Sequence, residues 1–292
     1  MYCRLSESFF LPSGNIQPNG VQCRSMATNP PRIGAIILAG GGVPATLSQY
    51  CTYRALLRLN GRYLLEYLLD ALRGIPSIER ISLVAPAETL ADLDSLPCIK
   101  VAASDTLVDN MQRGADALED ATLTHCLFIT GDVPLVTAEG LSDFIRASIE
   151  STAALSYPII PQAASERRFP GAKRTYVRLR EGTFTGGNAF LTRAHLLDDK
   201  HAIIQELYLS RKNPFKLAKI FGWSVVLRLL LGILSLPYME KVASRILSAP
   251  ARAIITQHAE IGFDVDKADD LAAVERARAE AATFPSTAPN GA

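Results

Sequence analysis

The stretch Ile33-Gly34-Ala35-Ile36-Ile37-Leu38-Ala39-Gly40-Gly41-Gly42 decides the fold of this chain of 292 residues. Its apolar run is typical of a strand that is buried on both faces of a parallel sheet. The three glycines that follow lack a Cβ, so their backbone N–H groups can turn toward an anion. The stretch therefore predicts a buried strand that leads into a loop of the size of a phosphate. A simple tight turn is the alternative at this point.

Short apolar segments alternate with segments of helical periodicity after the glycines. We expect strands at 81–85, 99–102 and 125–130, and helices at 64–72, 88–96 and 105–118, the last capped by Ser104 or Asp105. Parallel neighbours need crossover connections, so this order predicts an α/β fold with a mostly parallel sheet and helices on both faces. Ligands of such sheets bind at the carboxyl ends of the strands, where the glycines lie.

Composition excludes several classes of function. The formal net charge is only +1, which argues against nucleic acid as a partner. The cysteines are scattered, with no Cys-x-x-Cys pair, and so predict a reducing, cytoplasmic location and no zinc site; they are Cys3, Cys23, Cys51, Cys98 and Cys126.

Two acidic motifs suggest a metal site. Asp132 follows the expected strand 125–130 directly, and it is either a Mg²⁺ ligand or a turn former ahead of the next helix. Asp264 and Asp266 share one side if their segment is extended, which suits further ligands. Helix capping is the alternative for Asp266.

Three segments together resemble the MobA-like nucleotidyltransferase family, in this order and at suitable spacing: Ile37–Gly42, Gly131–Pro134 and Phe263–Leu271. Members of this family transfer a nucleoside monophosphate from an NTP to a phosphate- or phosphonate-bearing acceptor, on a Rossmann-like fold and with Mg²⁺. The resemblance extends over about 33–281, apart from an apolar stretch.

The resemblance implies roles for individual residues. Asp132 would hold the metal that bridges donor and acceptor phosphates. Asp105 and Asn110 would touch the nucleobase, although helix capping is an alternative for this region. The triphosphate would lie on Leu38, Ala39, Gly40, Gly41 and Gly42.

The chain also departs from the family pattern. No basic residue occurs in 43–48, where the family usually has an arginine, and Arg54 replaces the usual lysine. Arginine is a planar fork and not a compact ammonium, so this exchange is not neutral. Either Arg54 and Arg58 serve the triphosphate, or activity is weakened or lost. We take Arg54 and Asp132 as the candidate catalytic residues.

The acceptor side is expected in a basic, hairpin-like extension of the sheet between 167 and 188. Alternation in 176–180 predicts a half-exposed strand, and a Gly-Gly pair then precedes Asn188. In similar nucleotidyltransferases the corresponding extension helps to form the acceptor pocket. Lys173, Arg174 and Asn188 are therefore the candidate acceptor-binding residues.

An apolar segment from 214 to 247 is unusual for this fold. Asn213 and Pro214 predict the start of a helix, and Arg228 and Pro237 interrupt the apolar run, which makes a membrane span improbable. Three interpretations stay open: an added buried or dimer helix, a helical cover over the acceptor site, or a helix that contacts a membrane surface through 214–236. In the last case the protein is peripheral to a membrane, and the acceptor could be a lipid or isoprenoid phosphate.

We expect five regions: a disordered extension (1–31), a nucleotidyltransferase core (32–212), an apolar helical insertion (213–248), a return to the core (249–282) and a disordered tail (283–292). The predicted activity is Mg²⁺-dependent transfer of NMP from an NTP to a phosphorylated small-molecule acceptor, with release of pyrophosphate. A non-catalytic nucleotide-binding or regulatory protein and a nucleotide-sugar glycosyltransferase are the alternatives.

Overall fold

The computed structural model describes residues 30–210 and 219–283, and its described residues from Pro31 onward belong to one compact unit. Both termini that were expected to be disordered lie outside the described residues, except for the few positions next to the core. Asn213 and Pro214, the expected start of the apolar helix, also lie outside them. The sequence-based boundaries between the five regions therefore stay predictions.

A mixed sheet forms the centre of the protein, in the order β5-β4-β1-β6-β10-β7-β9-β8, with β11 paired to β7. The strands β5, β4, β1 and β6 are parallel neighbours, whereas β10 lies antiparallel between β6 and β7. The strands of this sheet are β1 (Ile33–Leu38), β4 (Ile78–Ala85), β5 (Ile99–Ala102), β6 (His125–Thr130), β7 (Leu155–Pro161), β8 (Val177–Leu179), β9 (Gly182–Gly186), β10 (Ala189–Arg193) and β11 (Ala251–Ile255). The expected α/β fold with a mostly parallel sheet is confirmed.

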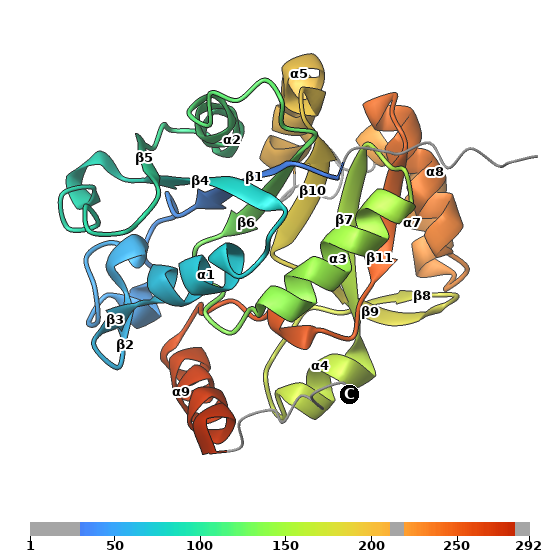
Figure 1. Cartoon of the computed structure of the whole chain (residues 1–292). Coiled ribbons are helices and arrows are strands. Elements are labelled where there is room, and N and C mark those ends of the chain that lie inside the picture. The colour runs from blue at the N-terminus through green and yellow to red at the C-terminus, as the bar shows by residue number, and fades with distance from the viewer. Residues whose placement is uncertain (1–29, 211–218, 284–292) are drawn as a thin grey trace, which may run out of the picture. The chain divides into compact units, whose positions relative to one another are not determined.

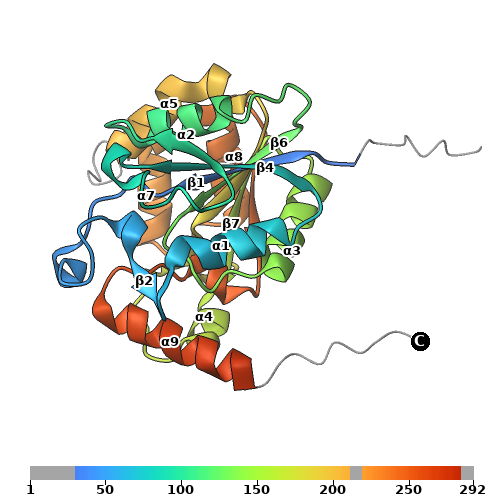
Figure 2. The same cartoon turned by 60° about the vertical axis from the view of Figure 1, so that its left-hand side comes forward.

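Helices cover both faces of the sheet (Figures 1 and 2). Helices α1 (Leu64–Arg73) and α3 (Ala138–Glu150) lie on one face, and α2 (Leu107–Asp116) and α5 (Leu196–Ser210) lie on the other. Helix α8 packs against β11 and α5. The remaining described elements are the small hairpin β2 (Arg58–Leu59) and β3 (Arg62–Tyr63) and the helices α4 (Gln162–Arg168), α7 (Trp223–Leu230), α8 (Leu236–Leu247) and α9 (Ala268–Thr283).

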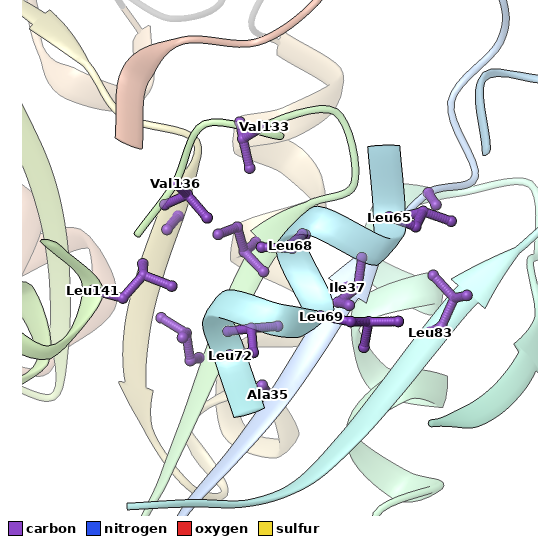
Figure 3. Close-up of a cluster of buried hydrophobic side chains, with 14 of the residues drawn as sticks. Ala35, Ile37, Leu65, Leu68, Leu69, Leu72, Leu83, Val133, Val136 and Leu141 are labelled. Carbon is purple, nitrogen blue, oxygen red and sulfur yellow. The ribbon is translucent and has the colours of Figure 1, made fainter. Parts of the chain in front are cut away.

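Strand β1 is buried because it contributes to two cores. Successive side chains of a strand point to opposite faces, so Ile37 packs under α1 and Ile36 packs under α2. Figure 3 shows the first of these clusters, in which Leu68 and Leu72 of α1 lie over the sheet. Burial of one such side chain stabilises the fold by about 1.5–3 kcal/mol. The unbroken apolar run 35–38 therefore reflects the central position of the strand.

Strands β9 and β10 together form one interrupted strand along β7. Gly187 lies at the interruption, and its N–H donates to the Pro158 carbonyl oxygen at 2.9 Å, which continues the pairing between the two halves. A Cβ at this glycine would lie 2.7 Å from Pro158 Cγ, so a larger residue would push the two strands apart. The first half pairs with β8 and forms the expected hairpin extension, and the second half pairs with β6.

One helix prediction was wrong. The segment 88–96 contains only the 3₁₀ turn Ala87–Thr89 followed by further turns, because Asp92, Asp94 and Ser95 are weak helix formers and Pro97 disfavours a helical conformation at Leu96. The described part of the apolar segment contains two separate helices, α7 and α8. Helix α7 ends at Leu230, and Gly232 then takes a left-handed conformation with φ of 66° before α8 begins.

No helix within residues 30–210 and 219–283 combines the length and the hydropathy that a crossing of the bilayer requires.

Candidate active site

The glycine loop follows β1 at the carboxyl edge of the sheet, and its base is fixed by backbone hydrogen bonds. Ala39 N–H donates to the Val84 carbonyl oxygen at 2.8 Å. A Cβ at Gly40 would lie 3.2 Å from Ala103 Cβ and 3.3 Å from Asn110 Nδ2, whereas Gly41 and Gly42 face open space. Only Gly40 is therefore tightly constrained by its neighbours, and the other two glycines leave room for a ligand.

A pocket of about 300 Å³ opens beside this loop. The sequence-predicted nucleotide-binding residues form much of its wall, with the exception of Gly42. The pocket is lined by Leu38, Ala39, Gly40, Gly41, Arg54, Ala55, Ser104, Asp105, Leu107, Asn110, Thr130, Gly131 and Asp132. The volume is at the lower end of the range for ligand pockets in proteins.

The two acidic motifs meet at the edge of this pocket. Asp132 follows β6, and Asp264 and Asp266 lie in the connection between the 3₁₀ turn Ala259–Gly262 and α9. One carboxylate oxygen from each of the three lies within 4.8 Å of the others. The backbone holds them there, because Val265 N–H donates to the Asp132 carbonyl oxygen at 3.0 Å. Asp132 is buried and Asp266 is exposed, so the cluster spans the edge between core and solvent.

Arg54 lies between the pocket and the acidic cluster. Its Nη1 is 2.9 Å from Asp132 Oδ2, and its Nη2 is paired with Asp266 and donates to the Val265 carbonyl oxygen at 2.7 Å. Arg58, the other basic residue considered for the triphosphate, donates to Gly61 O at 2.8 Å and stacks on Tyr63. Arg54 is thus the basic residue of this pair that lines the pocket.

Burial and neighbouring charges shift the pKa values of this cluster in opposite directions. Burial raises the pKa of Asp132, against the opposing charge of Arg54. Burial, together with the charges of Asp132 and Asp266, also raises the pKa of Asp264. Burial acts the same way on Asp266, but the hydrogen bond and charge of Arg54 outweigh it and lower the pKa of Asp266. The three carboxylates thus carry more negative charge than the guanidinium of Arg54 alone neutralises.

These residues fit a hard divalent cation. Asp132 Oδ1 is buried and has no hydrogen-bond partner among the described residues, so one ligand position is free. Carboxylate oxygens are the ligands that Mg²⁺ prefers, and Mg²⁺ takes only one or two carboxylates beside water and substrate phosphates. The Asp266 carboxylate is paired with Arg54, whereas Asp270 Oδ2 accepts from the N–H groups of Asp266 and Lys267 at the start of α9, at 3.1 and 3.2 Å.

The loop before α2 differs from the prediction in one detail. The helix begins at Leu107 and its cap is Thr106, whose hydroxyl accepts from Asp109 N–H at 3.1 Å, so neither Ser104 nor Asp105 caps it. Thr106 fits the cap position because its side-chain oxygen lies three residues before that N–H. Asn110 Oδ1 accepts from Ser104 N–H at 2.5 Å and its Nδ2 donates to Ser104 O at 3.2 Å. Asn110 therefore braces the wall of the pocket.

The predicted acceptor residues divide between two places. Arg174 joins the acidic cluster: its Nη1 is 2.5 Å from Asp264 Oδ1, and its guanidinium lies 4.3 Å from the centre of the Phe263 ring. Asn188 is next to the pocket wall, because its carbonyl oxygen accepts from Thr130 N–H at 3.0 Å. Lys173 instead lines a different cavity, beside α9.

Sequence reasoning did not single out Thr130. Its hydroxyl is buried and lines the pocket beside Asp132, where it acts against the effect of burial on the pKa of that carboxyl. Its position as the last residue of a strand, directly before Gly131, was the signal that could have identified it.

The comparisons with known proteins agree with this geometry. A family model described as the MobA-like NTP transferase domain matches residues 35–213. A hypothetical transferase from Thermus thermophilus is 38% identical, with a TM-score of 0.74 over 82% of this chain and 99% of that chain. No protein with curated annotation matches the chain in sequence.

Two further solved structures share the fold at low identity. A CMP:2-keto-3-deoxy-manno-octonic acid synthetase complexed with CTP is 9% identical, with a TM-score of 0.56 over 85% of this chain and 99% of that chain. A 4-diphosphocytidyl-2C-methyl-D-erythritol synthase from Anaerococcus prevotii is 15% identical, with a TM-score of 0.53 over 85% and 98%. Because the family model covers more than half of the chain, the protein belongs to the MobA-like NTP transferase family, whose members are nucleotidyltransferases.

Proposed function

We propose that this protein transfers a nucleoside monophosphate from an NTP to a phosphorylated small-molecule acceptor, and that Mg²⁺ is its metal. The observation that carries the proposal is the convergence of Asp132, Asp264 and Asp266 beside the glycine-loop pocket. The donor triphosphate would lie along Leu38–Gly42, with its base near Asp105 and Asn110. Arg174 and Asn188, with Lys173 from the neighbouring cavity, would receive the acceptor.

The reaction needs positioning and charge neutralisation more than covalent help from the protein. An oxygen of the acceptor phosphate forms a bond to the α-phosphorus. The bond from that phosphorus to the bridging oxygen breaks, and its electron pair leaves with pyrophosphate. When bound, Mg²⁺ would neutralise charge on the phosphate oxygens, held by the three aspartates.

Arg54 and Arg174 would serve this reaction as fixed cations. Arg54 lines the pocket and is held by Asp132 and the Val265 carbonyl oxygen, so its guanidinium is oriented before a substrate arrives. Arg174 is held by Asp264 in the same way. Because both guanidinium groups are already in place, they do not have to move as negative charge develops on the phosphates, and this favours transfer.

Pyrophosphate release tests the proposal. Purified protein would be incubated with each of the four NTPs, Mg²⁺ and a set of phosphorylated acceptors. We expect one combination to release pyrophosphate, and Asp132→Asn to reduce the rate at least a hundredfold. Asp269→Asn is the matched control, because Asp269 is exposed on α9 outside the acidic cluster. Activity that survives in Asp132→Asn would refute the metal role.

The same assay separates the alternatives. A thermal shift by an NTP without turnover of any acceptor would favour a non-catalytic nucleotide-binding protein. Cleavage of a nucleotide-sugar without pyrophosphate release would favour a glycosyltransferase. Such enzymes ordinarily carry an Asp-x-Asp pair after the middle strand, and here Asp132 occupies that place without a second aspartate two residues away.

We also propose that α7 contacts a membrane surface from a cytoplasmic, peripheral position. Large apolar side chains are exposed on α7 and in the turn that follows it, among them Leu227, Leu230 and Leu231. Leu230 has 79% of its surface exposed, and contiguous exposed apolar patches of this kind mark interaction sites. Lys219 and Arg228 lie beside them and favour an anionic surface.

A further inference from the structure

A second cavity, of about 360 Å³, lies between α8 and the extension of the sheet. Its wall is almost entirely apolar and includes Leu155, Leu179, Phe184, Leu234, Leu236 and Met239. Among its lining residues Phe184 and Leu234 are buried, whereas Tyr157 and Val177 are exposed, so the cavity reaches into the core and opens to solvent. Nothing in the proposed transfer of a nucleotide uses this space.

The charged groups in the wall are occupied with one another. Glu240 Oε1 accepts from Ala253 N–H at 3.0 Å, and Glu240 Oε2 is 3.5 Å from Arg252 Nη1. Tyr157 also lines the cavity, but its hydroxyl donates to the Gly187 carbonyl oxygen at 2.8 Å. The cavity therefore offers an occupant mainly apolar contact, and a polar molecule would lose its hydrogen bonds to water there.

This cavity and the nucleotide pocket lie on the same face of the sheet. Phe190 stacks on Phe128, with ring centres 4.8 Å apart, on the face covered by α2. Side chains two residues apart in a strand share a face, which places Thr130 and Asn188 there as well. Across β10 and β7, Thr192 is paired with Leu155, so Leu155 and Tyr157 continue the same face.

Asn188 stands between the two spaces. On one side its carbonyl oxygen accepts from Thr130 N–H at 3.0 Å, and Thr130 lines the nucleotide pocket. On the other side Gly187 accepts from Tyr157, which lines the apolar cavity together with Gly186. The segment 186–188 thus contacts a residue of the nucleotide-pocket wall on one side and a residue of the apolar-cavity wall on the other.

We infer that the apolar cavity binds the hydrocarbon chain of the acceptor, which is then a phosphorylated amphiphile. This inference rests on the proposed function, because it assigns the acceptor's phosphate to the side of Arg174 and Asn188. Val225, on the buried side of α7, packs with Leu234 of the cavity wall, so α7 lies next to the cavity.

Binding of n-alkyl monophosphates of two, four, six and eight carbons tests the inference by calorimetry, below their micelle concentrations and with no turnover required. Each methylene buried in an apolar site improves affinity about fourfold. We expect affinity to rise with chain length until the cavity is full. Prenyl monophosphates of equal carbon number are measured in parallel, and the series that binds more tightly identifies the type of chain.

Two variants locate the chain. Ala243→Phe and, separately, Ala253→Leu put bulk into the cavity wall, and both should abolish the dependence on chain length. Ala91→Phe is the control, because Ala91 is exposed in the connection between β4 and β5. The thermal shift by an NTP should be the same in all three and reports an intact nucleotide pocket.

Affinity that is independent of chain length in the unmodified protein would overturn the inference. So would a chain-length dependence that survives in both filled variants, because the chain would then bind elsewhere. These readouts are separate from pyrophosphate release. A protein that binds the chain but transfers no nucleotide refutes the proposed function, whereas transfer to short polar phosphates without any chain-length effect refutes the inference alone.

Discussion

The guanidinium of Arg54 lies 2.9 Å from the carboxylate of Asp132, and both side chains are largely buried. Arg54 comes from a 3₁₀ turn after the glycine loop, and Asp132 comes from the end of β6. The pair therefore joins the donor side of the site to the acidic cluster. Arg54 occupies part of the space around three carboxylates and compensates their charge, so its effects on folding and on metal binding should have opposite signs.

Replacement of Arg54 by Met tests this opposition. Without Arg54, the buried carboxylate of Asp132 loses its ion-pair partner, and the free energy of unfolding without metal should fall by about 3 kcal/mol. The affinity for Mg²⁺ should rise, because a competing positive charge is gone. Urea unfolding with EDTA and with Mg²⁺ measures both effects. Arg54→Lys keeps the charge and should lose less stability. A metal affinity that falls in Arg54→Met would contradict this account.

Mg²⁺ alone should stabilise the folded protein. A ligand at a hundred times its dissociation constant stabilises by about 2.7 kcal/mol, which raises the thermal midpoint by several degrees. Asp264→Asn should abolish most of this shift, because it removes one of the three converging carboxylates. Differential scanning calorimetry with and without Mg²⁺ measures it. Asp269→Asn should keep the full shift, and a similar loss in both variants would argue against the cluster.

Gly40 should not tolerate a methyl group. A Cβ there would lie 3.3 Å from Asn110 Nδ2, and movement of Asn110 would disturb its hydrogen bonds to Ser104 in the pocket wall. We expect Gly40→Ala to weaken NTP binding about tenfold, as measured by calorimetry. A Cβ at Gly42 would face open space, so Gly42→Ala is the control for stability, and its thermal midpoint should equal that of the unmodified protein. Unaltered NTP binding in Gly40→Ala would show that the wall can adjust.

Stability should fall in mild acid because of His125 at the start of β6. Burial, followed by the charge of Arg193, lowers the pKa of His125 below its ordinary value of 6.5. Between the lowered pKa of the folded protein and the unfolded value of 6.5, the unfolded chain binds more protons than the folded protein. The stability that neutral His125 contributes is therefore complete above pH 6.5 and is lost as the pH falls through the folded pKa. Urea midpoints measured between pH 5 and 7 should show a shallower dependence in His125→Gln. Equal slopes would assign the acid sensitivity to other groups.

The sequence predicted those parts of the fold that depend on local pattern. The strands at 99–102 and 125–130 match β5 and β6, because both segments are short and rich in β-branched or aromatic residues. The segment 88–96 was misassigned because the spacing of its apolar residues fits a helix, whereas Asp92, Asp94 and Ser95 favour turns. Apolar spacing alone does not show which of these two preferences prevails.

The site was predictable where each residue follows its own strand end. Asp132 and the glycines lie at carboxyl ends, so their convergence follows from the topology. The ion pairs of Arg54 with Asp266 and of Arg174 with Asp264 join residues far apart in sequence. The spacing of apolar residues along the chain does not predict such pairs. The apolar cavity likewise needs α8, β7 and β9 in place. It is a property of packing and not of any one segment.

Contact with a membrane should depend on the exposed leucines after the start of α7. Leu230 and Leu231 are 79% and 62% exposed, and burial of a leucine in an apolar medium is worth about 1.5–3 kcal/mol. We expect the protein to float with anionic vesicles, and the double variant Leu230→Gln with Leu231→Gln to lose at least tenfold in recovery. Ile255→Gln removes an exposed apolar side chain from β11 and is the matched control. Equal recovery of all three proteins with the vesicles would assign these leucines to a protein interface, because a lipid surface would distinguish the α7 variant from the control.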